Sequence, residues 1–361
     1  MKRILFVDLG SHYGGVETYL EGLIDMLRPQ AECYALCSLP RLASNLRDRG
    51  VVTTCLPFLR GKWSKAFRVM LAFVIVPFIV LTHRIRIVQL NGYFETYLLL
   101  PLRILGCKSV YTMHGPFEAD LYSWYRNPIL FASRFISQYC VWSASVVVCV
   151  SETVGAIART VLAAEKVHVI PNWVEVPVES KKVYAVQSPV RLLFVGRVER
   201  HKGVHLILEA IEELPGVSLL VVGDGSYRPE LERLSQGLTV RFLGFQSHPE
   251  KFYDVSDIFV NPSLGPEGLP LVSLEAMAHG LPCIFSGLPV HHEISGEGRV
   301  AALFASGDAL NLREQLRLLI QSEERRQTSG IKARDSVKLK YSFNVAAEQY
   351  LEVFAQIHGN A

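Results

Sequence analysis

Short apolar runs and amphipathic stretches alternate along the whole chain. In the first half, runs of strand length occur at residues 2–10, 31–37, 51–57, 85–92, 109–115 and 144–151. Apolar residues at helical spacing lie between several of them, at residues 16–27, 41–49, 64–81, 94–105 and 128–142. Strands that alternate with helices predict a parallel sheet with helices on both faces, which is an α/β architecture.

The same pattern restarts in the second half of the chain. Strand, loop and helix follow one another from residue 191, and further strands are expected at residues 217–226, 238–246, 257–263, 281–287 and 301–306. Between the two halves, residues 167–189 lose periodicity and collect proline and charge, which is typical of a linker. Because 361 residues exceed what one core usually supports, we expect two domains, residues 1–185 and 186–340, and a final helix within 341–361.

Composition narrows the class of protein. Half of the residues are hydrophobic and 20% are charged, as in a globular enzyme, and a formal charge of +3 is too small to indicate nucleic acid as a partner. The seven cysteines show no CxxC spacing, which fits reduced thiols in the cytoplasm. The first residues enter a strand without the features of a signal peptide. We therefore expect a cytoplasmic protein.

The apolar run at residues 69–81 has two interpretations. It contains 13 residues interrupted by Pro77, whereas about 20 are needed to cross a bilayer. The favoured interpretation is a buried helix that leads into the next strand. Basic residues flank the run on both sides, however, so a peripheral contact of residues 60–86 with the inner face of the cell membrane stays open.

Two carboxylates bracket a turn rich in glycine and proline in the stretch 261–280. Glu267 precedes a helix that is expected to begin near Pro270, and Glu275 lies inside that helix. Pro270 has no N–H group, so the helix would offer a phosphate the N–H groups of the three following residues, Leu271, Val272 and Ser273. The alternative is a surface loop capped by acidic residues.

A basic loop follows the first strand of the second half. Arg197 and Lys202 are five residues apart in this loop, so a guanidinium and an ammonium could approach one diphosphate from two directions. They would neutralise the charge that develops on a departing nucleotide. By themselves, basic residues in a loop are more often part of a solvated surface.

In the first half, several polar residues and glycines are expected where strands end. The carboxyl edge of a parallel sheet is where such folds bind ligands, and the residues expected there are Gly14, Gly15, Asn91, His114, Gly115 and Ser151. No G-x-G-x-x-G is present, which makes a dinucleotide site unconvincing. His291 and His292 are adjacent and cannot converge on one metal, so we interpret them as exposed loop histidines.

These motifs, in this order, resemble the retaining GT-B glycosyltransferases of family four over nearly the whole chain. The segments that carry the resemblance are GGVE, MHG, VSE, IPN, FVGRVERHKG, VVGDG, FLGF, NPS and EGLPLVSLEAMAHG. The resemblance implies two Rossmann-like domains facing across a cleft, with the last helix returning toward the first domain. It also implies transfer of a hexose from a UDP- or GDP-sugar donor to a hydroxyl of a glycan or lipid-linked glycan of the cell envelope.

The resemblance assigns roles to individual residues. It implies that Arg197 and Lys202 hold the diphosphate, that Glu275 binds the ribose, and that Glu267 binds the donor sugar near its anomeric carbon. It implies further donor contacts from the backbone of Leu269, Pro270, Leu271 and Val272, from Gly14 and Gly15, from the side chain of His114, and around the base from Gly223, Asp224 and Phe245.

Two departures from the family pattern and two competing functions remain. Leu269-Pro270 stands where Phe-Gly is frequent, and Trp173 stands where glycine is common. No D-x-D occurs in the chain, so we expect no metal or other cofactor, with the basic loop and the helix start neutralising the diphosphate. A sugar-nucleotide 2-epimerase and a non-catalytic sugar-nucleotide-binding protein are the alternatives to a transferase.

Overall fold

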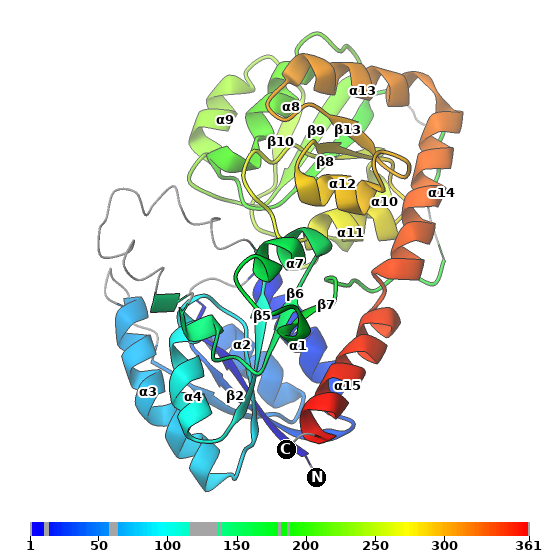
Figure 1. The fold of residues 1–361 in the computed structure, drawn as a ribbon. Helices are drawn as coiled ribbons and strands as arrows, with labels where there is room; N and C mark the ends of the chain where they lie inside the picture. The colour runs from blue at the N-terminus through cyan, green and yellow to red at the C-terminus, as the bar shows by residue number, and fades with distance from the viewer. Residues whose placement is uncertain are drawn as a thin grey trace. The chain divides into compact units, whose positions relative to one another are not determined.

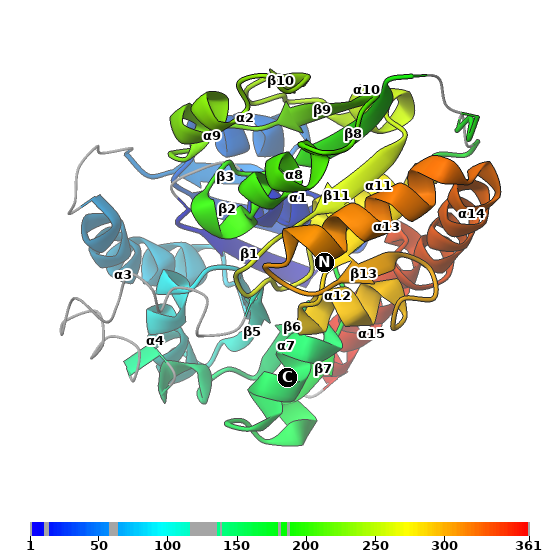
Figure 2. The same ribbon diagram turned by 90° about the horizontal axis from the view of Figure 1, so that it is seen from above.

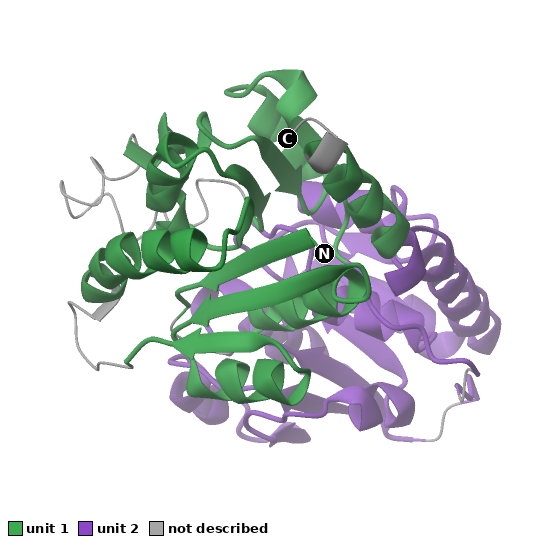
Figure 3. Cartoon of the chain, turned by 90° about the horizontal axis from the view of Figure 1, so that it is seen from below, with its two compact units in different colours: residues 1–172, 346–361 green, residues 173–345 purple. Residues whose placement is uncertain are grey.

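The protein folds into two compact α/β units. The computed structural model describes residues 2–10, 14–57, 64–115, 136–137, 139–179, 182–185 and 188–359. Unit 1 consists of residues 1–172 and 346–361, and unit 2 consists of residues 173–345 (Figure 3).

Unit 1 is built on a parallel sheet with the strand order β3-β2-β1-β4-β5-β6-β7 (Figure 1). The strands are β1 (Lys2–Asp8), β2 (Ala31–Cys37), β3 (Val52–Cys55), β4 (Ile87–Leu90), β5 (Lys108–Met113), β6 (Val146–Cys149) and β7 (Val167–Val169). The helices are α1 (Gly15–Leu27), α2 (Pro40–Asp48), α3 (Ser64–Thr82), η1 (Phe94–Leu98), α4 (Leu99–Ile104), α7 (Glu152–Arg159), η2 (Ala164–Lys166) and α15 (Phe343–Gly359). All six predicted strands are present. The helix predicted at residues 128–142 lies largely outside the described residues.

Unit 2 has a parallel sheet with the order β10-β9-β8-β11-β12-β13. Its strands are β8 (Val190–Val195), β9 (Val217–Val222), β10 (Val240–Phe242), β11 (Ile258–Asn261), β12 (Cys283–Ser286) and β13 (Ala302–Phe304). Its helices are η3 (Arg200–Lys202), α8 (Val204–Ile211), α9 (Arg228–Leu234), α10 (Glu250–Val255), α11 (Leu271–Ala278), α12 (Pro289–Ser295), α13 (Ala309–Gln321) and α14 (Glu323–Lys340). Helices α8 and α13 pack together on one side of the sheet, and α11 and α14 pack on the other (Figure 1). The sequence pattern therefore predicts the layers of this unit correctly.

The proline-rich segment after β7 is part of unit 2. We expected a domain boundary near residue 185, whereas the compact units divide between Asn172 and Trp173. The N–H group of Val174 donates to the carbonyl of Tyr341 at 2.9 Å, and the guanidinium of Arg326 donates to the carbonyl of Tyr184 at 3.0 Å. Because backbone groups of this segment are bonded to α14 and the residue that follows it, the segment is held on unit 2 although its sequence has no periodicity.

The last helix belongs to unit 1. Tyr350 of α15 is fully buried, and its hydroxyl is hydrogen-bonded to the hydroxyl of Tyr19 on α1. The Tyr19 hydroxyl also lies 3.1 Å from the hydroxyl of Thr112 on β5. A buried tyrosine needs a partner for its O–H group, so these contacts place α15 specifically against α1 and the sheet.

Helix α3 is only half buried, which differs from the favoured interpretation of residues 69–81 as a buried helix. Ala72, Val76 and Val80 are buried, but Val74 is 71% exposed and Phe78 is 66% exposed. The apolar run is continuous around the helix, while the sheet can cover only one face of it. In the described part of the chain, no helix combines the length and apolar character that crossing a membrane requires.

Gly203 shows where the backbone of unit 2 requires glycine. It has a φ angle of +72° between η3 and α8, and a Cβ atom there would overlap the carbonyl oxygen of Pro262. Gly237 has a comparable φ angle of +87°, but nothing lies within 4 Å of the position of its Cβ. Substitutions at the two positions therefore distinguish the cost of backbone strain, which both share, from the cost of a close contact, which only Gly203 has.

We predict that Gly203→Ala destabilises the protein more than Gly237→Ala. Left-handed strain costs about 1–2 kcal/mol at either position, and the clash with Pro262 should add about 1–3 kcal/mol at Gly203 alone. Chemical denaturation measures both free energies of unfolding. Equal losses in the two variants would contradict the close approach of Gly203 to Pro262.

Candidate active site

The predicted donor-site residues of unit 2 gather at the carboxyl edge of its sheet. Arg197 follows β8, Gly223 and Asp224 follow β9, and Phe245 follows β10. Glu267 lies in the segment between β11 and α11. Because all strands of the sheet are parallel, their carboxyl ends meet at one edge. The topology thus brings loops distant in sequence to one region.

Lys202 and Glu267 form an ion pair at this edge. The Lys202 ammonium lies 2.6 Å from a carboxylate oxygen of Glu267, and the two side chains are only 18% and 12% exposed. Burial alone would raise the pKa of Glu267. The charge and the hydrogen bond of Lys202 outweigh burial, together with a hydrogen bond from Ser263, and hold the pKa below its usual value. Glu267 is therefore ionised and shielded, while Arg197 on the neighbouring loop is exposed.

The two loops that carry this pair are also joined through their backbones. The N–H group of Leu264 donates to the carbonyl of His201 at 2.7 Å, and the hydroxyl of Ser263 donates to the same carbonyl at 3.4 Å. His201 directly precedes Lys202. These hydrogen bonds thus hold the two loops together next to the ion pair.

Helix α11 begins as predicted, with Pro270 as its N-cap residue. The N–H groups of Ser273 and Leu274 donate to the carbonyl of Pro270 at 3.1 and 3.3 Å. Ser273 is therefore not available as a phosphate donor, which corrects the expectation from the sequence. Leu271 and Val272 occupy the first turn, where N–H groups have no partner within a helix. They remain the amides of this helix start that an anion could reach.

Glu275 lies inside α11 and is half-buried. It accepts a hydrogen bond of 2.6 Å from the hydroxyl of Tyr253 on α10. Burial raises the pKa of Glu275, and the bond from Tyr253 opposes this effect. The tyrosine fixes one carboxylate oxygen, so the other remains to accept a hydroxyl group of a ligand.

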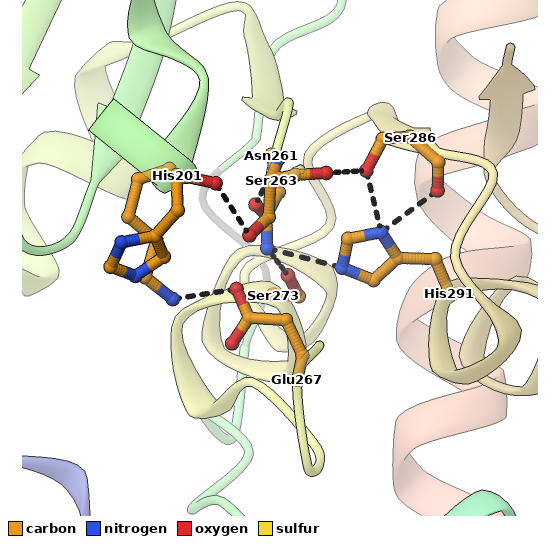
Figure 4. A network of polar contacts seen from close by, with 8 residues as sticks. His201, Asn261, Ser263, Glu267, Ser273, Ser286 and His291 are labelled. Carbon is orange, nitrogen blue, oxygen red and sulfur yellow. Dashed lines mark hydrogen bonds and ion pairs between the residues drawn. The ribbon is translucent and has the colours of Figure 1, made fainter. Parts of the chain in front are cut away.

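A buried polar network supports the segment that carries Glu267 (Figure 4). The amide nitrogen of Asn261 lies 3.0 Å from the hydroxyl of Ser273 and 3.4 Å from Nε2 of His291. Nδ1 of His291 lies 2.8 Å from the carbonyl of Ser286, and the hydroxyl of Ser286 donates to the carbonyl of Ser263 at 2.6 Å. The network ties the ends of β11 and β12 to the start of α11.

The two adjacent histidines are not exposed loop residues, as we had interpreted them. Both lie on α12, and His291 is completely buried. Burial lowers the pKa of His291 to about 4. The neutral ring donates from Nδ1 to the Ser286 carbonyl and accepts at Nε2 from Asn261. Consecutive helical residues point in different directions, so His292 instead pairs with Glu297 at 2.8 Å.

Close backbone packing shapes the part of the edge predicted to surround a base. The N–H group of Gly223 donates to the carbonyl of Gly244 at 2.8 Å, and a Cβ at Gly223 would overlap the carbonyl of Gly196. Asp224 accepts the N–H group of Gly225 at 2.8 Å, and Phe245 is 59% exposed. An exposed aromatic ring suits stacking on the face of a nucleobase.

In unit 1, Gly14 and Gly15 form the start of α1, and His114 follows β5. The rings of His114 and Tyr19 are 4.6 Å apart and perpendicular. Burial lowers the pKa of His114 to about 3, so the ring is neutral, and its Nε2 has no hydrogen-bond partner among the described residues. An enclosed nitrogen without a partner is suited to a ligand hydroxyl.

Other polar residues expected at this edge differ in role. The side chain of Ser151 accepts a hydrogen bond of 3.1 Å from the N–H group of Val154 and so caps the N-terminus of α7. Asn91 is buried and its carbonyl oxygen accepts from Gln89 at 3.0 Å. In the parts of the chain that the structure describes, no group of three His, Cys, Asp or Glu side chains is arranged to hold a metal ion.

Sequence reasoning missed Tyr253, Asn261 and His291. Asn261 lies in the quoted NPS motif, and its position directly after a strand was an available signal. Tyr253 lies 22 residues from Glu275, and His291 lies 30 residues from Asn261. No local pattern marks such contacts.

Comparison with known proteins identifies the family. Residues 13–176 match the model of Glycosyltransferase Family 4, and residues 189–322 match the model of Glycosyl transferases group 1. The two matches correspond to most of unit 1 and most of unit 2. Together the two matches show that the chain belongs to the GT-B glycosyltransferases that combine these two domains.

Individual relatives cover parts of the chain. It is 34% identical to the sulfoquinovosyl transferase of Arabidopsis thaliana over 44% of this chain and 33% of that protein. It is 30% identical to the phosphatidyl-myo-inositol mannosyltransferase of Mycobacterium leprae over 52% of this chain and 53% of that protein. The chain thus spans about half the length, or less, of these relatives.

The fold matches a solved structure over its whole length. The crystal structure of Anabaena HepE in complex with UDP superimposes with a TM-score of 0.82, at 18% identity, over 99% of this chain and 100% of that chain. At this level of identity the match defines the fold.

We predict that His291→Gln alters the dependence of stability on acid. A histidine held neutral in the fold, with its pKa lowered to about 4, binds fewer protons than the unfolded chain does below about 6.5. Stability from this group is therefore complete above about pH 6.5 and is lost as the pH falls toward 4. The variant should be less stable at pH 7 by about 1–3 kcal/mol and should show a shallower acid-side slope.

Urea unfolding at several pH values between 4 and 7.5 measures both effects. His292→Gln, one residue away and partly exposed, is the matched control and should lose no more than about 1 kcal/mol of stability at pH 7. An unchanged slope in His291→Gln would show that the buried ring does not titrate as described.

Proposed function

We propose that this protein is a retaining glycosyltransferase that moves a sugar from a nucleoside diphosphate to a hydroxyl acceptor. The observation that carries the proposal is the enclosed pair of Lys202 and Glu267 beside the start of α11. A cation, a carboxylate and free helix amides then lie at one sheet edge, in a chain of the glycosyltransferase family. This set can bind a diphosphate and the hydroxyls of a sugar.

The diphosphate site would use charges that are already in place. Lys202 and Arg197 would contact the phosphates, and the amides of Leu271 and Val272 would add donors at the positive end of the helix dipole. A phosphate held by Lys202 would compete with Glu267 for the ammonium, leaving the carboxylate able to accept sugar hydroxyls. Glu275 would accept the ribose hydroxyls with the oxygen that Tyr253 leaves available.

The chemical step follows from stabilising the leaving group. Charge builds up on the diphosphate oxygen as the bond to the anomeric carbon breaks, and fixed cations and amides lower the energy of that state. The acceptor hydroxyl would attack on the same face, form the new C–O bond and pass its proton to the departing phosphate. In this scheme Glu267 orients the sugar and is not a covalent nucleophile. Arg197, Lys202 and the helix start supply the positive charge, so no metal ion is required.

The substrate classes proposed here draw on the relatives. HepE was crystallised with UDP, and an Arabidopsis relative and a mycobacterial relative are named for transfer of sulfoquinovose and for mannosylation of phosphatidyl-myo-inositol. A relative from Rhizobium meliloti is named for lipopolysaccharide core biosynthesis. We therefore favour a UDP-sugar, with a GDP-sugar as the second choice, and a glycan or lipid-linked glycan as acceptor. Phe245 and the backbone at Gly223 and Asp224 would receive the base.

A peripheral membrane contact through unit 1 is part of the proposal. Helices α3 and α4 lie side by side in two perpendicular views (Figures 1 and 2). Both helices carry exposed apolar side chains, and Leu105 directly after α4 adds another. These residues are Met70, Phe73, Val74, Phe78, Leu81, Leu100, Ile104 and Leu105. Arg84, Arg86 and Arg103 are exposed close to them in sequence. An apolar surface with basic residues suits a bilayer that contains anionic lipid.

We predict that a matching sugar nucleotide raises the melting temperature, and that Lys202→Ala weakens this effect. Ligands that bind only the folded state stabilise it by mass action. Removing one charged contact to a phosphate should lower affinity by about 10- to 100-fold. A thermal-shift panel of UDP-, GDP- and ADP-sugars makes the measurement.

The matched control is Arg200→Ala. Arg200 lies on the same turn η3, but its side chain is 74% exposed and faces Glu230. It should respond like the wild type. If no sugar nucleotide shifts the wild type, the donor assignment is wrong. Conversion of a sugar nucleotide to an isomer without acceptor would favour an epimerase instead.

We predict that the wild type floats with vesicles containing phosphatidylglycerol and that Val74→Asp/Phe78→Asp does not. A charge at either exposed position would have to be desolvated at the bilayer surface. Leu310→Asp changes a similarly exposed apolar residue in unit 2 and should leave flotation intact. Absence of binding by the wild type at low salt would remove the membrane contact from the proposal.

A further inference from the structure

Four charged side chains are buried together where β1 leads into α1 in unit 1. Asp8 ends β1, Glu17 lies in α1, Arg68 lies in α3, and Glu95 lies in η1. Each is between 1% and 4% exposed. Charged side chains are seldom buried to this extent unless they are paired or bonded, because desolvation is costly. The hydrogen-bond partners of these four side chains therefore indicate their role.

The three carboxylates all accept hydrogen bonds from the backbone between β1 and α1. Glu95 accepts the N–H group of Leu9 at 2.5 Å, Asp8 accepts that of Gly10 at 2.9 Å, and Glu17 accepts that of Gly14 at 2.7 Å. The bonds thus hold both ends of this connection.

The arginine holds the same stretch from its carbonyl side. Arg68 donates to the carbonyl of Gly10 at 2.8 Å and to the hydroxyl of Ser38 at 2.9 Å. Ser38 donates in turn to the Gly10 carbonyl at 2.5 Å. Both polar groups of the Gly10 backbone are therefore bonded to buried side chains, so the peptide is fixed in orientation as well as in place.

Glycine at position 10 is needed for this arrangement. A Cβ atom there would lie 2.5 Å from a carboxylate oxygen of Glu17 and 2.9 Å from one of Asp8. These distances are shorter than any real contact, and the bonds of the two carboxylates leave them little freedom to move. The two carboxylates are therefore packed directly against the main chain at Gly10.

We propose that Asp8, Glu17, Arg68 and Glu95 are positioning residues that set the backbone of Gly10 and Gly14 for contact with the sugar nucleotide. The inference rests on the proposed function and on the family resemblance, which implies that Gly14 and Gly15 contact the donor. Unlike Lys202 and Glu267, the four residues act through the main chain and do not touch the substrate. Glu17 is the most direct test, because it belongs to the helix that begins at Gly15.

The electrostatics of the group add a dependence on pH. The charged groups that face Glu17 are Asp8, Glu21 and Glu95, and Arg68 is the cation of the group. Burial, followed by the charge of Asp8, raises the pKa of Glu17 to about 7 and that of Glu95 to about 7. An ionised carboxylate accepts a backbone N–H group more strongly than a neutral one does. The hold on Gly14 should therefore be firm above about pH 7 and weaker below it.

The experiment compares Glu17→Gln with Glu21→Gln. Glu21 lies one turn along the same helix and is also buried, but it is bonded to Arg49 and Asn45. Hydrogen exchange followed by NMR reports the amides of Leu9, Gly10 and Gly14 directly. Nucleotide release, with the sugar nucleotide that gives the largest shift in the thermal panel, reports kcat/KM.

In Glu17→Gln we expect the Gly14 amide to exchange about tenfold faster at pH 8, and kcat/KM to fall about tenfold. The difference from the wild type should shrink at pH 6. The plot of kcat/KM against pH for Glu17→Gln should therefore lack the inflection near pH 7 that the wild type shows. Glu21→Gln should keep the wild-type exchange rate of the Gly14 amide and the wild-type kcat/KM at pH 8, where Glu17 is ionised in both proteins.

Amide exchange and kcat/KM equal to those of the wild type in Glu17→Gln would overturn the proposal. If this variant does not fold, Glu95→Gln takes its place, with the Leu9 amide as its reporter and the same criteria. Failure of the proposed function gives a different result, because no sugar nucleotide would then shift the wild type. The amide exchange would still decide whether the four residues hold the backbone.

Discussion

Parallel strands impose the constraint on which the rest of this structure depends. Each strand must be followed by a crossover before the next one can pair, so every segment that leaves a strand does so at the same edge of its sheet. In unit 2 this edge collects the loop of Lys202, the segment of Glu267 and the start of α11. In unit 1 it collects Gly10, Gly14 and His114. The candidate site residues are concentrated at these edges because all strands of a parallel sheet end at the same edge.

Loops at such an edge must still be held in one conformation, and each unit does this with buried polar side chains. In unit 2, His291, Asn261 and Ser286 bond the ends of two strands to the segment of Glu267. In unit 1, carboxylates and an arginine bond the main chain around Gly10. A buried polar group without a partner costs about 1–3 kcal/mol, so each network favours the one loop conformation that satisfies all of its members.

Helix α3 shows why hydrophobicity alone does not indicate burial. Its apolar residues extend around the whole helix, and the fold covers only the side that includes Ala72, Val76 and Val80. The uncovered side is not explained by the packing of unit 1. The proposed contact with a lipid surface would account both for the exposed apolar residues and for the arginines close to them in sequence.

Much of the architecture could be predicted from short-range patterns in the sequence. Continuous apolar runs marked the buried parallel strands, and Pro270 and Gly280 marked the limits of α11. The residues proposed to bind the diphosphate could also be predicted from the sequence, because charged side chains beside strand ends and glycines form short patterns. The enclosed ion pair joins residues that are 65 positions apart, and no local pattern in the sequence shows that the two side chains meet.

The tertiary structure decided which polar residues are buried and what they contact. His291 and His292 are equivalent as neighbours in sequence, yet His291 is bonded to the end of β11 through Asn261, whereas His292 faces Glu297 at the surface. Asp8, Glu17, Arg68 and Glu95 come from four separate elements, and no periodicity links them. Burial and hydrogen-bond partners depend on how distant elements pack, whereas helix and strand signals depend on residues a few positions apart. That difference in range is why the elements could be predicted from the sequence and the networks that hold the site could not.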